Sequence, residues 1–348
     1  MNNHLRSKPE SKKMPPFFIF GAQRSGTTLF RLMINNHPAL AIPPESHFFL
    51  RLFKYLPLKG ELSPEEVKLA GNIIDSEPRF KTWNISEKRL KELLADLSSP
   101  TLADIVTAVF EEQIKGSGKV RWGDKTPEYI VIMQQISSLF PDAAFLCVVR
   151  DGRDVIRSLH DKNWQGWSNY QRAHYWADCV ERIENFAKKL GEKRVLRVHY
   201  EDLVLNTEDT LRKVCSYLEV SYDGNMVRYH ENFEHNITNQ EKISGVHTKL
   251  GRKPRKDDAF RWKAQSSDLS TYLFELVAGD ALDLVGLERK FPKKKTILRF
   301  IISNAYIGFG QFLSILYFFY HKFFSQGVKK KLNTYKFFAL LKKVIRST

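Results

Sequence analysis

Short, continuous apolar runs alternate with amphipathic segments along this 348-residue chain. Three such runs predict strands that are covered on both faces, as in a parallel sheet. These runs are 17–20, 143–149 and 195–198. Apolar residues at helical spacing predict helices between and after them. The main ones are 28–36, 87–97, 101–114, 170–190, 207–218 and 267–286, with another that ends at Leu159. Strands alternating with helices predict an α/β fold with a parallel sheet flanked by helices.

The charge distribution divides the chain into three parts. The net charge is +16, but the segment 289–348 holds 14 Lys or Arg and no Asp or Glu. We therefore expect a disordered leader at 1–16, one folded domain at 17–288 and a basic tail at 289–348. The leader has no apolar run, which argues against a signal peptide or an N-terminal anchor. The nearly neutral body argues against a nucleic-acid partner, because the basicity belongs to the tail.

The tail carries an apolar stretch at 296–320, about as long as a membrane span of some 25 residues. On a helical wheel, however, Arg299, Gln311 and His321 share one side, whereas Phe312 and Phe319 lie on the other. This segregation favours a helix that lies on an anionic membrane surface. A true span and helices packed on the protein remain the alternatives. The chain is accordingly predicted to be cytoplasmic and peripherally membrane-associated.

A glycine-containing turn, Gly21–Thr28, joins the first strand to the first helix. Such a turn lets backbone amides and the helix N-terminus converge on an anion. The nucleoside-triphosphate loop, G-x-x-x-x-G-K-[ST], has the same glycine spacing. Here Thr27 takes the place of its lysine, and the cation is Arg24 instead. The sheet is therefore predicted to be P-loop-like, and the displaced cation weakens the case for an ATPase or a GTPase. The residues expected to bind the anion are Arg24, Ser25, Gly26, Thr27 and Thr28.

A second motif, L-C-V-V-R-D-G-R-D-V-I-R-S, follows the second predicted strand. With R-S-G-T-T in the first loop, it resembles the motifs of sulfotransferases that use 3′-phosphoadenosine 5′-phosphosulfate (PAPS). The likeness is to the tyrosylprotein and bacterial carbohydrate branch and covers 17–288. It implies that the first loop binds the 5′-phosphosulfate and that Arg150 and Ser158 bind the 3′-phosphate. Arg150 also ends a strand at the edge where α/β folds bind ligands.

Sulfuryl transfer requires a general base and one or two cations. The resemblance implies that Glu45, after an H-P segment, is the catalytic base. His47 is the rival, because cytosolic family members use histidine. Lys125, in R-W-G-D-K-T-P, is expected to neutralise the bridging oxygen, and Arg24 the sulfuryl oxygens. The chemistry requires no metal, and the sequence has no evident metal-ligand cluster.

The predicted function is transfer of a sulfuryl group from PAPS to a hydroxyl or amine of a carbohydrate or glycolipid acceptor. A tyrosine-peptide acceptor is less expected, since no secretory anchor precedes the domain. Two alternatives remain: a kinase-type phosphotransferase with a P-loop, and a non-catalytic nucleotide-binding protein at a membrane. The kinase alternative requires Mg²⁺-dependent ATP binding, against which Thr27 counts.

Overall fold

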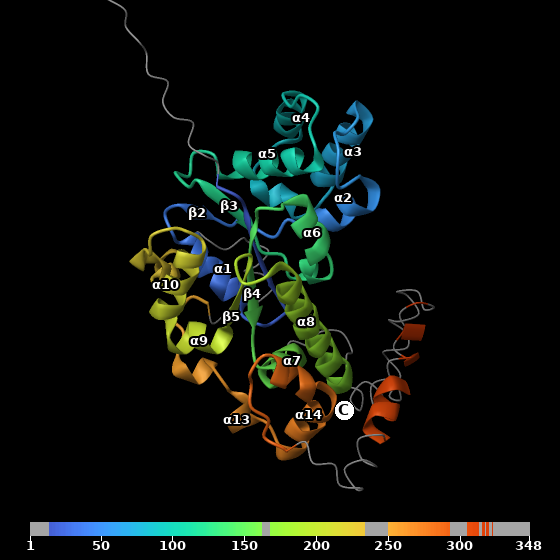
Figure 1. Cartoon of the computed structure of the whole chain (residues 1–348), viewed down its shortest axis with the longest axis vertical. Coiled ribbons are helices and arrows are strands. Elements are labelled where there is room, and N and C mark those ends of the chain that lie inside the picture. The colour runs from blue at the N-terminus through green and yellow to red at the C-terminus, as the bar shows by residue number, and fades with distance from the viewer. Residues whose placement is uncertain are drawn as a thin grey trace, which may run out of the picture.

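The computed structural model describes residues 14–161, 168–233 and 250–292, and short stretches within 305–322. Its centre is a parallel five-stranded sheet in the order β2-β3-β1-β4-β5 (Figure 1). The strands are β1 Phe17–Gly21, β2 Leu40–Ala41, β3 Arg121–Asp124, β4 Ala144–Val149 and β5 Val195–His199. Since the pairing is parallel, the carboxyl ends of all five strands meet at one edge.

The three predicted strands and the α/β class are confirmed, but β2 and β3 were not predicted. β3 reads R-W-G-D and has no apolar run, so it carries no strand pattern of its own. It is nevertheless wholly buried, and backbone carbonyl oxygens satisfy the guanidinium of its first residue. Arg121 donates to the carbonyls of Pro15 and Leu218, both at 2.6 Å. Tertiary partners therefore decide this strand rather than local propensity.

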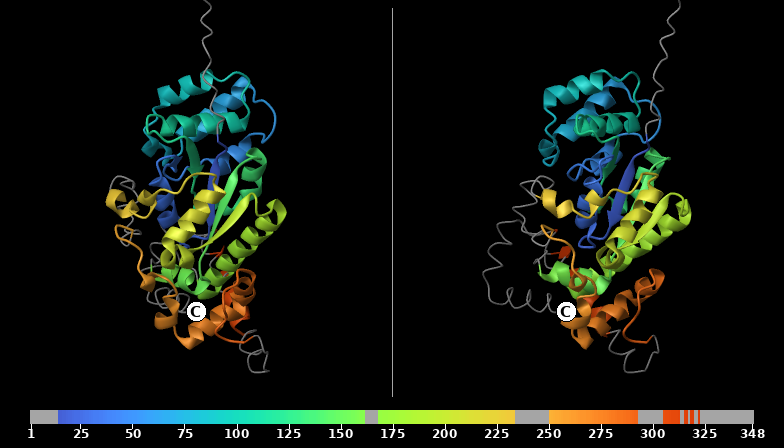
Figure 2. Two further views of the ribbon diagram at one scale, coloured as in Figure 1. Left: turned by 60° about the vertical axis from the view of Figure 1, so that its left-hand side comes forward. Right: turned by 90° about the vertical axis from the view of Figure 1, so that its left-hand side faces the viewer.

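Alternate residues of β1 bury into two cores on opposite faces of the sheet. Phe18 and Phe20 belong to one core, and Phe17 and Ile19 to the other. Helices α6 and α8 cover the first face, whereas α1, α9 and α10 cover the second (Figures 1 and 2). Their bounds are α1 Thr27–Asn35, α6 Met133–Leu139, α8 Asn169–Leu190, α9 Tyr200–Leu205 and α10 Thr207–Tyr217.

Two further groups of helices lie at opposite ends of the molecule (Figure 1). The upper group consists of α2 Phe49–Tyr55, α3 Pro64–Asp75, α4 Glu87–Ala95 and α5 Leu102–Ile114. The lower group consists of α7 Gly152–Asp161, α13 Trp262–Gln265 and α14 Asp268–Leu284. The predicted helices are confirmed to within a few residues at each end. The lower group adjoins the carboxyl ends of the strands, where the predicted site residues gather.

The predicted leader and most of the basic tail fall outside the described residues. The short helical stretches within 305–322 belong to the tail. None of the helices in the described parts of the chain combines the length and apolarity that a membrane span requires.

Candidate active site

The turn after β1 has the shape that an anion-binding loop needs. Gly26 caps α1 with a φ of 90°, a left-handed conformation that glycine adopts without strain. A Cβ atom at Gly26 would overlap the ring of Tyr200, and one at Gly21 would lie 2.7 Å from the Val148 carbonyl oxygen. Both glycines are thus required by close approach of the backbone to its neighbours. The turn is therefore built tightly onto the ends of β4 and β5.

Contacts within and across the turn hold its backbone in place. The Ser25 amide donates to the Ala22 carbonyl at 3.1 Å, and the Gln23 amide donates to the Tyr175 hydroxyl at 2.9 Å. Tyr175 comes from α8, so a helix on the sheet face fixes the loop. The buried hydroxyl of Ser25 has no hydrogen-bond partner among the described residues. A buried polar atom of this kind fits an anionic ligand in the loop.

The second motif lies directly against the first. Arg24 donates through Nε to the Ser158 hydroxyl at 3.1 Å, and Arg150 donates to the Arg24 carbonyl at 3.2 Å. The Arg150 guanidinium stacks on Tyr200, 4.2 Å from the ring centre. Burial, and then the charge of Arg150, lower the pKa of Arg24. The charges of Arg24 and Arg150 therefore interact unfavourably, and an anion with phosphate or sulfate groups between them would stabilise the site.

Asp154 organises the part of the chain that borders Arg150. Its carboxylate pairs with Arg150 at 3.5 Å and accepts the amides of Arg261 and Trp262 at 3.1 and 2.7 Å. Arg150 also donates to the Asp258 carbonyl at 3.4 Å. These contacts dock the chain around 258–262 onto the site. Sequence reasoning missed this carboxylate, since D-G-R-D gives no sign of which acidic residue points inward.

Glu45 lies among three cationic or hydrogen-bonding side chains. It forms an ion pair with Lys125, another with Arg79 at 2.7 Å, and a hydrogen bond with His47 Nε2 at 3.0 Å. Burial alone would raise the pKa of Glu45. The charge of Lys125, the hydrogen bonds from His47 and Lys125, and the charge of Arg79 outweigh it and hold that pKa well below its ordinary range. Glu45 is therefore ionised at any physiological pH.

A buried polar network fixes the backbone that carries Glu45. The Ser46 amide donates to the Thr126 hydroxyl at 3.1 Å, and the Ser46 and Tyr129 hydroxyls lie 2.8 Å apart. Thr126 donates to Asp124 at 3.3 Å. Burial raises the pKa of Asp124 to about 6, against hydrogen bonds from Ser46 and Thr126. The network joins the loop after β2 to the end of β3. The same hydrogen bonds therefore position the backbone of both Glu45 and Lys125.

Lys125 connects the predicted base to the anion-binding loop. Its side chain is only 1% exposed, and its Nζ lies 3.4 Å from the Thr28 hydroxyl as well as beside Glu45. The ammonium thus faces both the carboxylate and the start of α1. All predicted site residues therefore lie at one edge of the sheet, although they come from five separate segments.

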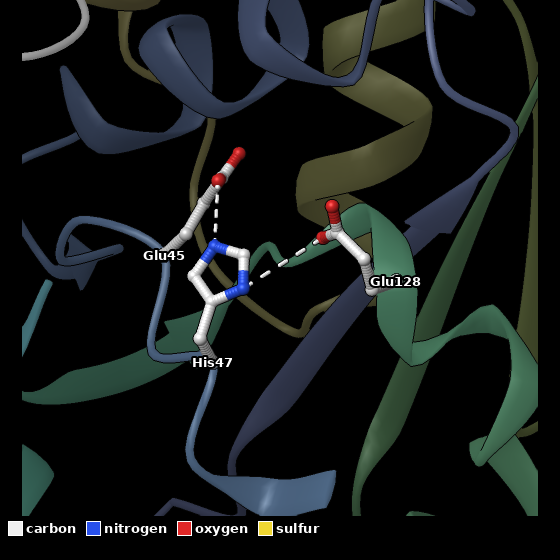
Figure 3. Close-up of side chains that lie close together, drawn as sticks. All are labelled: Glu45, His47 and Glu128. Carbon is white, nitrogen blue, oxygen red and sulfur yellow. Dashed lines mark hydrogen bonds and ion pairs between the residues drawn. The ribbon is translucent and has the colours of Figure 1, made fainter. Parts of the chain in front are cut away.

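Three donor atoms of Glu45, His47 and Glu128 lie within 4.8 Å of one another (Figure 3). That spacing would suit a metal ion, yet Glu45 is already paired with Lys125 and Arg79. A divalent cation here would sit beside two fixed positive charges, which disfavours it. We assign no metal to this group.

Arg79 and Glu128 were also missed from the sequence. Arg79 precedes a short 3₁₀ turn, Phe80–Trp83, and Glu128 lies in another, Pro127–Val131. Neither belongs to a recognisable motif, so no local signal identifies them.

Comparisons with known proteins identify the family. The family model described as "Sulfotransferase family" matches residues 15–224. A protein-tyrosine sulfotransferase of Drosophila melanogaster is 28% identical over 229 residues, covering 64% of this chain and 41% of that protein. Protein-tyrosine sulfotransferase A of Caenorhabditis elegans is 26% identical, covering 65% and 56% respectively. The chain spans about half the length of these curated relatives.

A solved structure shares the fold. The sulfotransferase domain of the Synechococcus PCC 7002 olefin synthase superposes with a TM-score of 0.57 at 20% identity. The match covers 82% of this chain and 99% of that one. At this identity the likeness establishes the α/β architecture alone.

Proposed function

This chain belongs to the sulfotransferase family, and on that premise we propose that it transfers a sulfuryl group from PAPS to a hydroxyl acceptor. The observation that carries the proposal is the meeting of its two phosphate motifs. Arg24, in the first motif, contacts Ser158 and Arg150 of the second at 3.1 and 3.2 Å. A nucleotide with phosphates at both its 5′ and 3′ ends needs two anion sites side by side, and the contact between the two motifs supports this proposal.

The donor residues divide between the two ends of PAPS. The amides and hydroxyls of Ser25, Gly26, Thr27 and Thr28 bind the 5′-phosphosulfate, with the positive end of α1 behind them. Arg150 and Ser158 bind the 3′-phosphate. Arg150 Nε is buried without a hydrogen-bond partner among the described residues, as expected of a group that serves a ligand.

Each of the proposed reacting residues serves a different atom of the transfer. The acceptor oxygen forms a bond to sulfur while the bond from sulfur to the 5′-phosphate oxygen breaks, and that oxygen keeps the electron pair. Glu45 takes the acceptor proton. Lys125 neutralises the charge that develops on the leaving oxygen, and Arg24 stabilises the sulfuryl oxygens.

Ligand titration distinguishes this proposal from a kinase. Calorimetry with 3′,5′-adenosine bisphosphate, the desulfated product, is expected to show binding that does not require Mg²⁺. Incubation with PAPS labelled in the sulfuryl group should give labelled product. Binding of Mg²⁺–ATP with no affinity for the bisphosphate would refute the sulfotransferase assignment. Bisphosphate binding without transfer or hydrolysis would favour the non-catalytic alternative.

The acceptor is proposed to be a hydroxyl of a carbohydrate or glycolipid. The basic tail supports this, since 14 Lys or Arg without an acidic residue suit a membrane-proximal substrate. The names of the curated relatives favour a second candidate, the hydroxyl of a peptide tyrosine. A panel of glycolipids, oligosaccharides and tyrosyl peptides, assayed with labelled donor, decides between them. Labelling confined to the peptides would overturn the carbohydrate assignment.

Attachment to an anionic membrane surface through the segment 289–348 is part of the proposal. Deletion of 293–348 should abolish sedimentation with phosphatidylserine vesicles and leave the bisphosphate affinity unchanged. Added salt should weaken the binding of the full chain, because exposed charges are screened. Vesicle binding that persists in the truncated protein would contradict this role of the tail.

A further inference from the structure

His47 has an uncommon backbone conformation. Its φ is 54°, in the left-handed region that residues other than glycine rarely occupy. The Phe48 amide donates to the Ser46 carbonyl at 2.8 Å, which closes a tight turn around it. Strained backbone persists where the surrounding structure enforces it, and it clusters at functional sites. The effect here is to aim the imidazole between two carboxylates, as Figure 3 shows.

The two ring nitrogens of His47 face different carboxylates. Nε2 lies 3.0 Å from Glu45 Oε2, and Nδ1 lies 3.9 Å from Glu128 Oε2. The Glu128 atom is buried and has no hydrogen bond to the described residues. The other carboxylate oxygen of Glu128 accepts from Gln23 in the anion-binding loop at 3.3 Å. Glu128 is thus held at the loop with one oxygen directed at the imidazole.

Exposure increases along this row of side chains. Glu45 is 13% exposed and lies among cations, His47 is 19% exposed, and Glu128 is 42% exposed. The row therefore leads from the buried carboxylate to the solvent. This is the geometry that a proton leaving Glu45 requires.

We propose that His47 and Glu128 form a proton exit for Glu45: His47 receives the proton that the base has taken from the acceptor, and Glu128 orients the imidazole and passes the proton to water. The inference rests on the proposed sulfuryl transfer. His47 is then neither the base itself, as the rival assignment from the sequence had it, nor a bystander.

The transfer balances as follows. In the resting site Nε2 carries the imidazole proton and donates it to the Glu45 carboxylate. Once Glu45 holds the acceptor proton, exchange with solvent moves the imidazole proton to Nδ1, and Nε2 then receives the proton from Glu45, which becomes a carboxylate again. The imidazolium loses its Nδ1 proton to water that bridges the 3.9 Å to Glu128, and this restores the resting tautomer. No electrons are exchanged with any other group, and the net product is one proton in solution.

The surrounding charges favour this direction. Lys125 contacts Glu45 Oε1, and Arg79 contacts Oε2, the oxygen that also faces His47. Both cations stabilise the ionised form of Glu45, so the protonated carboxyl is a ready donor. Asp124 lies buried behind the loop and adds negative charge near the imidazole. An imidazole is a stronger base than a carboxylate flanked by cations, so the proton moves outward.

The direct test is His47→Gly with imidazole added to the assay. Glycine accepts the left-handed backbone without strain, so the variant tests the side chain. Release of labelled sulfate from PAPS, with water as acceptor, gives a rate that needs no known substrate. We expect kcat to fall about 10²-fold with a bisphosphate Kd within about 2-fold of the parent. Imidazole should restore the rate in a saturable way. His174→Gly, at an exposed position on α8, is the control. Its kcat should stay near the parent value, with or without imidazole.

Glu128→Gln supplies a second, isosteric variant. It should lower kcat about 10-fold and shift the pH dependence of kcat. In the His47→Gly background its effect on kcat should largely vanish, because both residues serve the same proton path. Glu208→Gln, which removes an exposed ion pair on α10, is the matched control. Fully additive losses, or a profile that does not move, would contradict a shared path.

The outcomes separate the two proposals. A parent protein that neither binds the bisphosphate nor releases sulfate would refute the sulfotransferase function. An active parent whose His47→Gly variant retains the parent rate, or loses it without rescue by imidazole, would refute the proton exit alone.

Discussion

Replacing Glu45 by glutamine tests the central electrostatic arrangement of the site. The change preserves the shape of the side chain and removes its charge. Lys125, whose side chain is 1% exposed, then keeps a buried ammonium without a counter-ion, and Arg79 loses its ion pair at 2.7 Å. Because donor contacts are spared, the bisphosphate Kd should remain near the parent value. Turnover should fall about 10²–10⁴-fold if Glu45 is the general base.

The cost to stability follows from the buried pair. Removing one partner of a buried ion pair destabilises a protein by about 3–5 kcal/mol. Loss of the ion pair between Glu45 and Arg79 adds little to this cost, because Arg79 is half-exposed and solvent screens its charge. At about 2–4 °C per kcal/mol for a domain of this size, the Tm should fall by about 6–20 °C.

The loss of stability in Glu45→Gln should depend on pH. The pKa of Glu45 is depressed in the folded state, so its stabilisation is fully present above the ordinary value of 4.5 and is lost as the pH falls below it. The difference in Tm between parent and variant should therefore be largest near neutral pH and shrink in acid.

A double variant separates stability from catalysis. Glu45→Gln with Lys125→Met removes the orphaned ammonium and should recover more than half of the lost Tm, while turnover stays low. Melting curves and sulfate release measure the two effects on the same samples. Parent-like turnover in Glu45→Gln would show that the base lies elsewhere. A Tm within about 2 °C of the parent near pH 7 would show that the pair with Lys125 contributes little.

Three further substitutions test the donor site and the pH response. Arg24→Ala should weaken bisphosphate binding and lower kcat, both measured as above; unchanged affinity would place the 5′ end elsewhere. Gly26→Ala should destabilise the fold and abolish donor binding, because its Cβ overlaps the Tyr200 ring and its φ is 90°; wild-type binding would contradict the close packing. Burial raises the pKa of Glu201 to about 7, against a hydrogen bond from the Asp151 amide. Protonation is then favoured in the folded state, so stability declines as pH rises from about 4.5 to 7; Glu201→Gln should raise the Tm more at pH 8 than at pH 5, and an equal change at both would refute the cause.

The chain's local patterns determined the fold class and the two motifs proposed to bind the donor. An apolar run closed by Gly21, and the order of Arg24, Gly26 and Thr27 at a helix start, are properties of neighbouring residues. A backbone turn that binds an anion is built within one short segment, so its pattern is visible in the sequence. The same holds for Arg150 at a strand end.

Only the tertiary structure decided which charged groups surround Glu45, the proposed base. Glu45 meets Arg79 across 34 residues and Lys125 across 80, and Gln23 meets Glu128 across 105. The pKa of a carboxylate depends on burial and on charges within a few ångströms, which no local pattern encodes. The strand R-W-G-D likewise became a strand because its neighbours buried it. Local backbone motifs can therefore be predicted from neighbouring residues, whereas the distances between charges are fixed only when the folded sheet brings its loops to one edge.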